Sequence, residues 1–561
     1  MLNFLYDHYD TYDELTDRLK KLQRMYPELA KLNSIAATPE GRQLWMMVIT
    51  DFTVGEADLK PAYYIDGNFH AGEVTGSMVA LYTIDYLLSE FAVNQKIQQL
   101  LRRTVFYILP RVSPDGAEVY LTTPASLRSV PRMYPEPEQQ PGLVLQDING
   151  DGEILLMRQK SLYGDWKISS KDSRMMERRL PDEEDGEYYR IYQEGLIHKT
   201  EENGVEIQVA PAKWGLDLNR NFPCNWDVEA KQAGAGAYPL AAPETRAVAD
   251  FILNHKNIGY VSTLHTTGGA FLRLPGIKPE QQAPKLDIEI FKAIGEMAET
   301  ETGYASINVF SEFFSDPALV LSGAFDDWLY CNHGIPAHTI ELWDLANRAG
   351  IKNLYPHKQK NEKELAEDTL KILQWNDTEL QGEGFVGWSK FAHPQLGEVE
   401  IGGFKLKTML QNCPLRFLQA ECAKVCRFML RNANALPHLT AEEIHTEQVS
   451  TAIWKVSLLV GNSGYLPTNL TEEAIKLKAA KEVTAELSGI DVIEDAKQKI
   501  GHLAGRAGRT GRFSQGGYRS GQDAVSRKQV SWLLRATAGE VAVVTLQSAT
   551  AGTLVLQVPL R

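Results

Sequence analysis

Apolar residues along this chain follow two spacings, one typical of helices and the other typical of buried strands. Residues 10–25, 74–89, 286–302 and 414–431 carry apolar side chains at helical spacing. Strand-like apolar runs lie between them, at residues 31–37, 44–50, 62–69, 104–110, 260–265 and 337–342. The alternation of strands and helices predicts an α/β domain, with a mixed, mainly parallel sheet and helices on both faces.

Two polar stretches interrupt this pattern, and after them the apolar spacing changes to that of short strands alone. Residues 124–209 are polar with little periodicity, and residues 343–400 include a charged helix at 361–375. We interpret both stretches as insertions in a catalytic domain that covers residues 1–437. Residues 438–561 instead predict an all-β accessory domain, a sandwich. Its expected strands are residues 451–460, 482–487, 529–536, 540–546 and 553–560.

Composition narrows the class of protein. The formal net charge of −14 argues against a nucleic-acid partner, because nucleic-acid-binding domains are usually basic. Five cysteines are few and odd in number, which favours reduced thiols and a cytoplasmic location over a disulfide framework. We expect no membrane partner, since no run approaches the ~18 apolar residues of a span, and no signal peptide is visible. Export stays open if the chain was trimmed, and the oligomeric state is not predicted.

A histidine and a glutamate three residues apart close the apolar run at residues 62–69. His70 and Glu73 lie where a strand gives way to a helix, and imidazole nitrogen and carboxylate oxygen are both good zinc ligands. A catalytic zinc site needs three such ligands and one position for water. Alone the pair is a weak signal, because surface or capping residues often have this spacing.

Three further features suggest the rest of a site. His265 ends an apolar run and is followed by two glycines, although a strand-terminal histidine is more often structural. Asn219 and Arg220 could grip a carboxylate, or could belong to a surface turn. Glu341 lies in the middle of an apolar strand, where a buried charge is costly unless a cation is near; a structural ion pair is the alternative.

This set of residues, in this order, resembles the zinc metallocarboxypeptidase family of carboxypeptidases A and B. Residues 111–116 resemble the family's Asn-Pro-Asp-Gly segment, and residues 217–221 match its Asp-x-Asn-Arg-Asn motif. Residues 322–330 resemble the segment that leads to the catalytic glutamate, with no gap before Glu341. The resemblance covers roughly residues 8–345 and part of 410–435, with the insertions unmatched.

The resemblance implies one Zn²⁺ per chain, held by His70, Glu73 and His265. It implies that Asp217 is a second carboxylate that orients His70 without touching the metal.

The resemblance also implies a reaction. Asn219 and Arg220 would hold the free C-terminal carboxylate of a peptide substrate. Glu341 would deprotonate the zinc-bound water and later protonate the leaving amine.

Three positions depart from the family pattern or are uncertain within it. The arginine that stabilises the oxyanion falls where the first insertion lies; Arg158 best fits its context, with Arg128 and Arg132 as rivals. Leu319 stands where the family has a mobile tyrosine over the substrate. Asp326 occupies the specificity position, which implies either a preference for C-terminal Lys or Arg or a role as a neighbouring charge.

Other motifs are weaker. Residues 147–154 fit the first positions of an EF-hand loop, so a Ca²⁺ site at Asp147 and Asp151 is a secondary expectation; Arg158 stands where the bidentate glutamate belongs. Residues 501–512 resemble a helicase box, but no phosphate-binding loop accompanies them, so we expect a basic loop.

The pattern as a whole predicts a zinc-dependent metallocarboxypeptidase that hydrolyses the C-terminal peptide bond. Two alternatives stay open. One is a related zinc amidohydrolase acting on acylated amino acids or cell-wall peptides. The other is a zinc-binding pseudoenzyme, against which the presence of Glu341 beside all three ligands argues.

Overall fold

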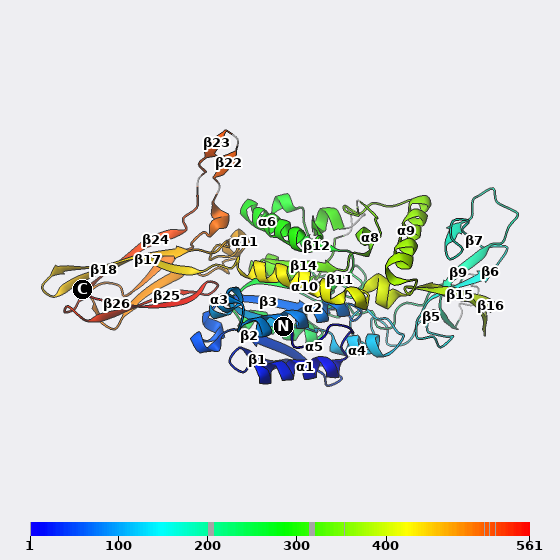
Figure 1. Cartoon of the computed structure of the whole chain (residues 1–561), viewed down its shortest axis with the longest axis horizontal. Coiled ribbons are helices and arrows are strands. Elements are labelled where there is room, and N and C mark those ends of the chain that lie inside the picture. The colour runs from blue at the N-terminus through cyan, green and yellow to red at the C-terminus, as the bar shows by residue number, and fades with distance from the viewer. Residues whose placement is uncertain are drawn as a thin grey trace.

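A mixed eight-stranded sheet forms the centre of the first domain in this computed structural model (Figure 1). The structure describes residues 2–199, 207–313, 320–352, 354–509, 511–514, 516–521 and 523–561. Four neighbouring strands of the sheet are parallel, and both flanks contain antiparallel pairs, which confirms the predicted mixed, mainly parallel sheet. The strand order is β1 (Ala30–Ala37), β2 (Gln43–Ile49), β4 (Val105–Leu109), β3 (Ala62–Gly67), β11 (Ile258–Thr266), β14 (Ala337–Leu342), β12 (Ala270–Arg273) and β13 (Ala305–Asn308).

Helices cover both faces of this sheet, because successive strand residues point alternately to two apolar cores. In β2, Met47 and Ile49 belong to one core, and Met46 and Val48 to the other. Five helices close the first core: α1 (Tyr12–Met25), α2 (Val74–Glu90), α3 (Gln95–Arg103), α6 (Lys285–Thr302) and α10 (Leu415–Ala433). Two close the second: α5 (Pro243–Asn254) and α7 (Phe325–His333).

The carboxyl ends of three parallel strands meet at one edge of the sheet, and this edge positions the candidate site. β3, β11 and β14 are adjacent, and their register pairs Asp66 with Thr263 and His265 with Glu341. In open α/β sheets, ligands bind at this edge. The strand ends therefore bring together residues as far apart in the chain as Asp66 and Glu341.

The two predicted insertions fold together into one accessory sheet, which the sequence did not indicate. β6 from the first insertion pairs with β16 from the second on one side and with β9 on the other. A bidentate ion pair between Arg174 and Asp377 also joins the two insertions. The strand order of the accessory sheet is β15 (Phe385–His393), β16 (Gly397–Phe404), β6 (Leu156–Lys160), β9 (Tyr189–Gln193), β7 (Trp166–Ile168) and β8 (Met176–Arg178).

Smaller elements surround this sheet. β5 (Gly142–Leu145) pairs with β10 (Gly195–His198) beside it. The charged helix expected at 361–375 is α9 (Glu362–Leu380), which begins at a capping box formed by Asn361 and Glu364. Short helices elsewhere in the first domain include α4 (Pro114–Thr122), α8 (Leu345–Arg348), η3 (Leu218–Arg220) and η6 (Leu406–Gln411).

Two four-stranded antiparallel sheets form the C-terminal part, in agreement with the predicted sandwich. Alternate residues of their strands, including Trp454, Trp532 and Val544, pack into one shared core. One sheet has the order β17 (Leu439–Ser450), β18 (Ile453–Asn462), β24 (Arg527–Arg535) and β20 (Asp491–Val492). The other has the order β21 (Lys497–Gly501), β19 (Val483–Ser488), β25 (Val541–Ser548) and β26 (Gly552–Pro559). A short hairpin, β22 (Arg512–Ser514) with β23 (Gly517–Arg519), projects from this part in Figure 1.

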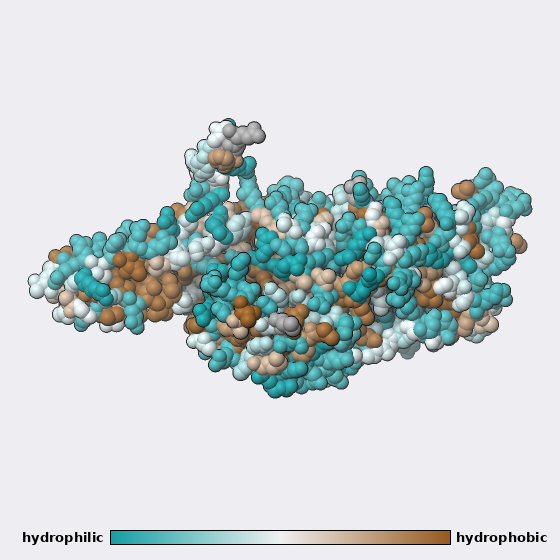
Figure 2. Space-filling view, viewed as in Figure 1, coloured by the Kyte–Doolittle hydropathy of each residue, from teal (hydrophilic) through white to brown (hydrophobic). Residues whose placement is uncertain are grey.

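The C-terminal part docks on the first domain through α11 (Glu472–Lys476) and the residues around it. The Asp287 carboxylate of α6 accepts hydrogen bonds from the first backbone amides of α11. Thr471 donates to the carbonyl oxygen of Gly334 at the end of α7. Figure 2 shows a mainly hydrophilic surface on this side of the molecule, with apolar patches on the C-terminal sheets, where Val541 and Val555 are exposed. No helix in the described part of the chain is long and apolar enough to cross a membrane.

Candidate metal centre and active site

A tight turn after β3 presents the first two candidate ligands. Asn68 adopts a positive φ of 63°, and its side-chain amide donates to the carbonyl oxygens of His70 (2.5 Å) and Ala71 (3.1 Å). Glu73 is the residue before α2 begins. Gly67 allows the close approach of strand and helix, since a Cβ atom there would lie 2.8 Å from the backbone of Gly76.

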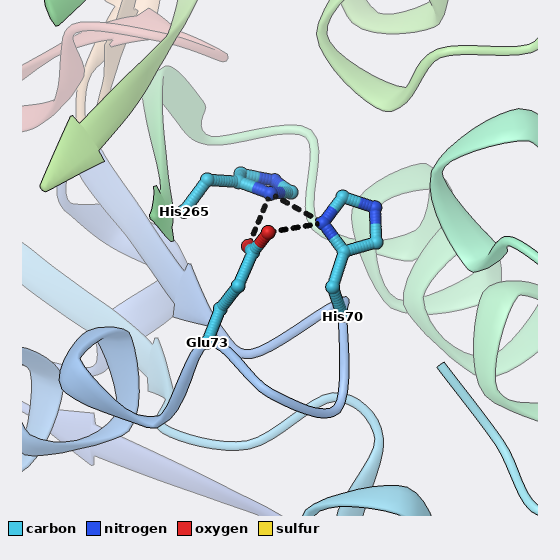
Figure 3. A group of neighbouring side chains, drawn as sticks. All are labelled: His70, Glu73 and His265. Atoms are coloured by element: carbon cyan, nitrogen blue, oxygen red, sulfur yellow. Dashed lines mark hydrogen bonds and ion pairs between the residues drawn. The ribbon is translucent and has the colours of Figure 1, made fainter. Parts of the chain in front are cut away.

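His70, Glu73 and His265 converge on one point, as Figure 3 shows. The Nδ1 atom of His70 lies 2.8 Å from Glu73 Oε1, and the Nδ1 atom of His265 lies 2.9 Å from Glu73 Oε2. The two Nδ1 atoms are 3.1 Å apart. All three side chains are buried. The only other metal-sized group among the described residues is the more exposed set His8, Asp10 and Glu14.

The hydrogen bonds around these residues fit a metal ion. Asp217 Oδ1 accepts from Nε2 of His70 at 3.1 Å, and Thr263 Oγ1 lies 3.3 Å from Nε2 of His265. With protons on both Nε2 atoms, both Nδ1 lone pairs face Glu73 and each other, an arrangement that a cation at that point would stabilise. Glu73 Oε2 is buried without a hydrogen bond of its own. Two imidazole nitrogens and a carboxylate are ligands that Zn²⁺ accepts in catalytic sites.

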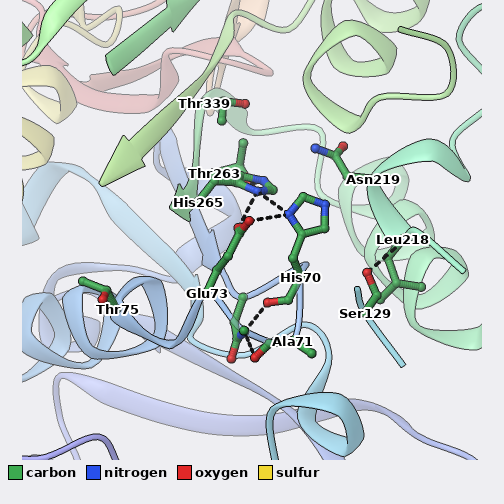
Figure 4. A network of polar contacts seen from close by, with 12 residues as sticks. His70, Ala71, Glu73, Thr75, Ser129, Leu218, Asn219, Thr263, His265 and Thr339 are labelled. Carbon is green, nitrogen blue, oxygen red and sulfur yellow. Dashed lines mark hydrogen bonds and ion pairs between the residues drawn. The ribbon is translucent and has the colours of Figure 1, made fainter. Parts of the chain in front are cut away.

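Arg128 lies beside this group and is bound to Asp217. Its Nε atom donates to Asp217 Oδ2 at 2.7 Å, and its Nη1 atom is 4.0 Å from Glu73 Oε1. Burial raises the pKa of Asp217, but Arg128 and His70 outweigh it and hold this pKa well below its ordinary value. The Arg128 side chain is 42% exposed, so one side of it lies on the carboxylates and another is open to a ligand. Figure 4 shows the neighbouring bond from the Leu218 amide to Ser129 Oγ, which anchors this segment.

Glu341 faces the same edge of the sheet from β14. It is the register partner of His265 on the neighbouring strand. Burial and the negative charge of Glu73 raise the pKa of Glu341 to about 8, although His265 and Arg128 act in the opposite direction. A carboxylate with a raised pKa next to a metal position has the properties of a general base.

Asn219 and Arg220 lie on η3, between the metal group and α7. The Asn219 Oδ1 atom accepts from the backbone amide of Phe325 at 2.8 Å, which fixes the side chain against the start of α7. Burial lowers the pKa of Arg220, while the charges of Asp217, Asp326 and Glu341 raise it. The guanidinium is thus held among carboxylates at the same edge.

Asp326 is buried below this pair and already has hydrogen-bond partners. Its Oδ2 atom accepts from Thr339 Oγ1 at 2.8 Å, and its Oδ1 atom accepts from the backbone amide of Asp327. Its charge acts on both Arg220 and Glu341. This environment agrees with the interpretation of Asp326 as a neighbouring charge; a preference for basic residues stays a prediction.

The prediction that Arg158 lies in the site is wrong. Arg158 is in β6 of the accessory sheet, where it pairs with Glu400 at 2.7 Å and lies over the Trp388 ring. Figure 1 places β6 apart from β11 and β14. Arg132 forms a bidentate ion pair with Glu244. Arg128, named as a rival, is the arginine at the metal group. The signal in the sequence was a single apolar residue, Val130, two positions after Arg128; the structure buries it in the second core, so the chain there belongs to the main domain.

Three other expectations have different outcomes. Asp147 and Asp151 use their carboxylates to accept backbone amides within an exposed turn, and they are not among the described metal-sized groups, so calcium is not supported. Leu319 lies outside the described residues. Tyr355, which the sequence did not suggest, donates to the Gly268 carbonyl oxygen at 3.2 Å, and burial and the charge of Glu341 raise its pKa.

Comparison with known proteins identifies the family. The family model described as "Zinc carboxypeptidase" matches residues 15–149 and 180–371, more than half of the chain. The chain belongs to the zinc carboxypeptidase family. All three candidate ligands, Arg128 and Glu341 lie in the matched parts, whereas Arg158 falls in the gap between them. A model of a domain of unknown function matches residues 438–559.

Individual zinc carboxypeptidases match over shorter segments. The catalytic chain of carboxypeptidase N from Homo sapiens is 36% identical over 109 residues, which is 19% of this chain and 24% of the relative. Carboxypeptidase B from Astacus astacus is 35% identical over 109 residues, 19% of this chain and 33% of the relative. The chain thus spans about a quarter to a third of these relatives' length. Among solved structures, carboxypeptidase A from Helicoverpa armigera has a TM-score of 0.39 at 16% identity, covering 67% of this chain and 74% of that one.

Proposed function

We propose that this protein is a zinc-dependent metallocarboxypeptidase that hydrolyses the C-terminal peptide bond of peptides. The observation that carries the proposal is the position of Glu341 beside His265, on the edge that also holds Arg128 and the Asn219–Arg220 pair. Family membership supports the same reaction class.

Each residue has a role that follows from its position. Bound zinc would act as a Lewis acid that lowers the pKa of water and polarises a carbonyl group. Glu341 takes a proton from the attacking water and gives it to the leaving amine. The open side of Arg128 donates to the oxygen on which negative charge develops. Asp217 keeps the Nδ1 atom of His70 directed at the metal.

The substrate's polarity follows from the remaining pair. An arginine next to an amide suits a carboxylate, because the guanidinium offers two parallel N–H donors. Asn219 and Arg220 therefore bind the free C-terminal carboxylate, and the scissile bond lies over the ligands one residue upstream.

A peptide library with free C-termini and the same peptides with amidated C-termini test this proposal. A carboxypeptidase releases single amino acids from the first set and leaves the second intact. Release from acylated amino acids or cell-wall peptides alone would favour the amidohydrolase, and zinc binding without any release would favour the pseudoenzyme.

Location is a separate proposal. The five cysteines are unpaired, which supports a reducing compartment such as the cytoplasm. Fractionation of cells that make the protein at its natural level tests it, with recovery outside the cytoplasmic fraction as the contrary result.

A further inference from the structure

A cavity of about 390 Å³ lies between the first insertion and the main domain. Its walls come from three stretches of chain: 124–127, 209–214 and 406–407, with β5 and the turn before β6 closing it. Most of its surface is apolar, and its volume is in the range of pockets that bind small organic ligands. The proposed catalytic residues do not use it.

All three stretches lead directly into the candidate site. Leu127 precedes Arg128, whose carbonyl oxygen accepts from the Ala71 amide in the ligand turn. Trp214 is three residues before Asp217. Beyond Lys407, the Asn412 side chain donates to the carbonyl oxygen of Gly72 at 2.7 Å. The cavity is therefore next to the metal group, on the side where Arg128 and the ligand turn meet.

In the proposed substrate pose, the cavity lies upstream of the scissile bond. Figure 4 shows Asn219 and Ala71 on opposite sides of the His70 ring, and the Ala71 amide is bonded to Arg128, the residue after the cavity-lining Leu127. A peptide whose C-terminus is held by Asn219 and Arg220 extends past Arg128 toward the cavity. An extended chain covers roughly 3.3 Å per residue, so the three residues upstream of the bond in a tetrapeptide span roughly 10 Å.

The charged side chains that line the cavity differ in whether they already have a partner. The Lys407 ammonium donates to the carbonyl oxygens of Tyr120 and Thr123, both at 2.6 Å. Lys213 lies over the Trp214 ring at 4.0 Å. Glu153 is part-buried, and its carboxylate accepts no hydrogen bond from the described residues; burial raises its pKa, although Lys405 and Lys407 oppose this. Glu153 is thus the group that still lacks a hydrogen-bond donor.

We propose that this cavity binds the amino-terminal end of a short peptide substrate. Apolar side chains of the first residues pack against its wall, and the terminal ammonium pairs with Glu153. This inference rests on the proposed function, and it defines the substrate class as oligopeptides of a few residues with a free, apolar N-terminal end.

Titration calorimetry on the zinc-loaded Glu341→Gln protein tests the inference without consuming the peptide. The probes are Leu-Leu-Ala-Ala, its N-acetylated form, Ser-Ser-Ala-Ala, and the dipeptide Ala-Ala, which is too short to reach the cavity. We expect Leu-Leu-Ala-Ala to bind roughly tenfold more tightly than the acetylated and the serine peptides. Added Glu153→Gln should abolish the effect of acetylation.

A cavity-filling variant supplies the second arm. Ala212 is exposed and lines the cavity, so Ala212→Trp fills it without disturbing the core. In the Glu341→Gln protein it should remove the advantage of leucine over serine and leave Ala-Ala binding unchanged. In the protein that retains Glu341 it should leave Ala-Ala turnover unchanged. Ala538→Trp, at an exposed position in the C-terminal part, is the matched control.

The outcomes separate the two proposals. Equal affinity for all three tetrapeptides, or an unchanged leucine preference in Ala212→Trp, overturns the cavity inference. Hydrolysis of Ala-Ala by the natural protein would still support the proposed carboxypeptidase activity. If no probe is bound or hydrolysed, both proposals fail together.

Discussion

His265 and Glu341 are register partners at the ends of the adjacent parallel strands β11 and β14. One is a candidate metal ligand and the other the candidate base, so the sheet itself sets their separation. Neither residue depends on a mobile loop for its position. The following predictions test the roles assigned to this edge.

Asp217 should control metal affinity through the tautomer of His70. Asp217→Asn keeps the shape of the side chain, but an amide can also donate to His70 Nε2 and so does not fix a proton on that atom. We expect zinc affinity to fall about 10- to 100-fold, measured by competition with a chromogenic chelator. Asp227→Asn, in an exposed loop, should bind zinc like the natural protein. Equal affinity in all three proteins would contradict the role of Asp217.

Two arginines should behave in opposite ways. Arg128→Ala removes a donor beside the metal group, so we expect kcat/KM to fall by about 10²- to 10³-fold. Arg158→Ala breaks a part-buried ion pair and a stacked contact in the accessory sheet. We expect it to lower the unfolding free energy by about 1–3 kcal/mol with little change in kcat/KM. A loss of activity confined to Arg158→Ala would restore the assignment made from sequence.

Asp326 should act on the substrate's carboxylate through Arg220 and not on the side chain that is released. Asp326→Asn is expected to raise KM severalfold for peptides ending in lysine and in alanine alike. Steady-state kinetics on the two matched peptides decide this. A loss confined to the lysine peptide would instead assign Asp326 to the specificity pocket.

Site residues could be predicted where a local sequence pattern marks them, and could not where their position depends on pairing between segments far apart in the chain. His70, Glu73, His265 and Glu341 each end or interrupt an apolar run, and such local patterns are legible in one sequence. Arg158 and Glu400 are 242 positions apart, and their pairing exists only because two insertions form one sheet. Strand pairing at that separation leaves no local periodicity, so the sequence predicted two unrelated insertions. The sequence therefore indicated no partner for Arg158 outside the site.

The fold shows the same division. The main sheet and the helices on its faces were predicted because their apolar spacing is strong. The strand β17, from Leu439 to Ser450, was missed, since most of its residues are exposed and alternate weakly. Tyr355 reaches Gly268 from the second insertion, and only the tertiary fold brings it there.

His438, where the two parts of the chain meet, should make stability depend on pH. Burial, together with the charges of Arg103 and Arg506, lowers the pKa of His438 to about 4. The unfolded value is near 6.5, so the unfolded state binds the proton first. The contribution of the neutral His438 to stability is therefore complete above pH ~6.5 and is lost as the pH falls toward 4.

A variant isolates this contribution. Between pH 7 and pH 5.5 the natural protein should lose about 1 kcal/mol more unfolding free energy than His438→Gln, measured by urea unfolding. An identical loss in both proteins would show that His438 does not carry the effect.

The central claim is that Glu341 is the base of a zinc carboxypeptidase site. The most direct measurement is the release of C-terminal amino acids by the natural protein and by Glu341→Gln, with zinc content determined on the same samples. We predict one zinc per chain in both proteins, and a fall in kcat of about 10²- to 10⁴-fold in the variant. Equal release by both zinc-loaded proteins, or no release by either, would contradict the claim.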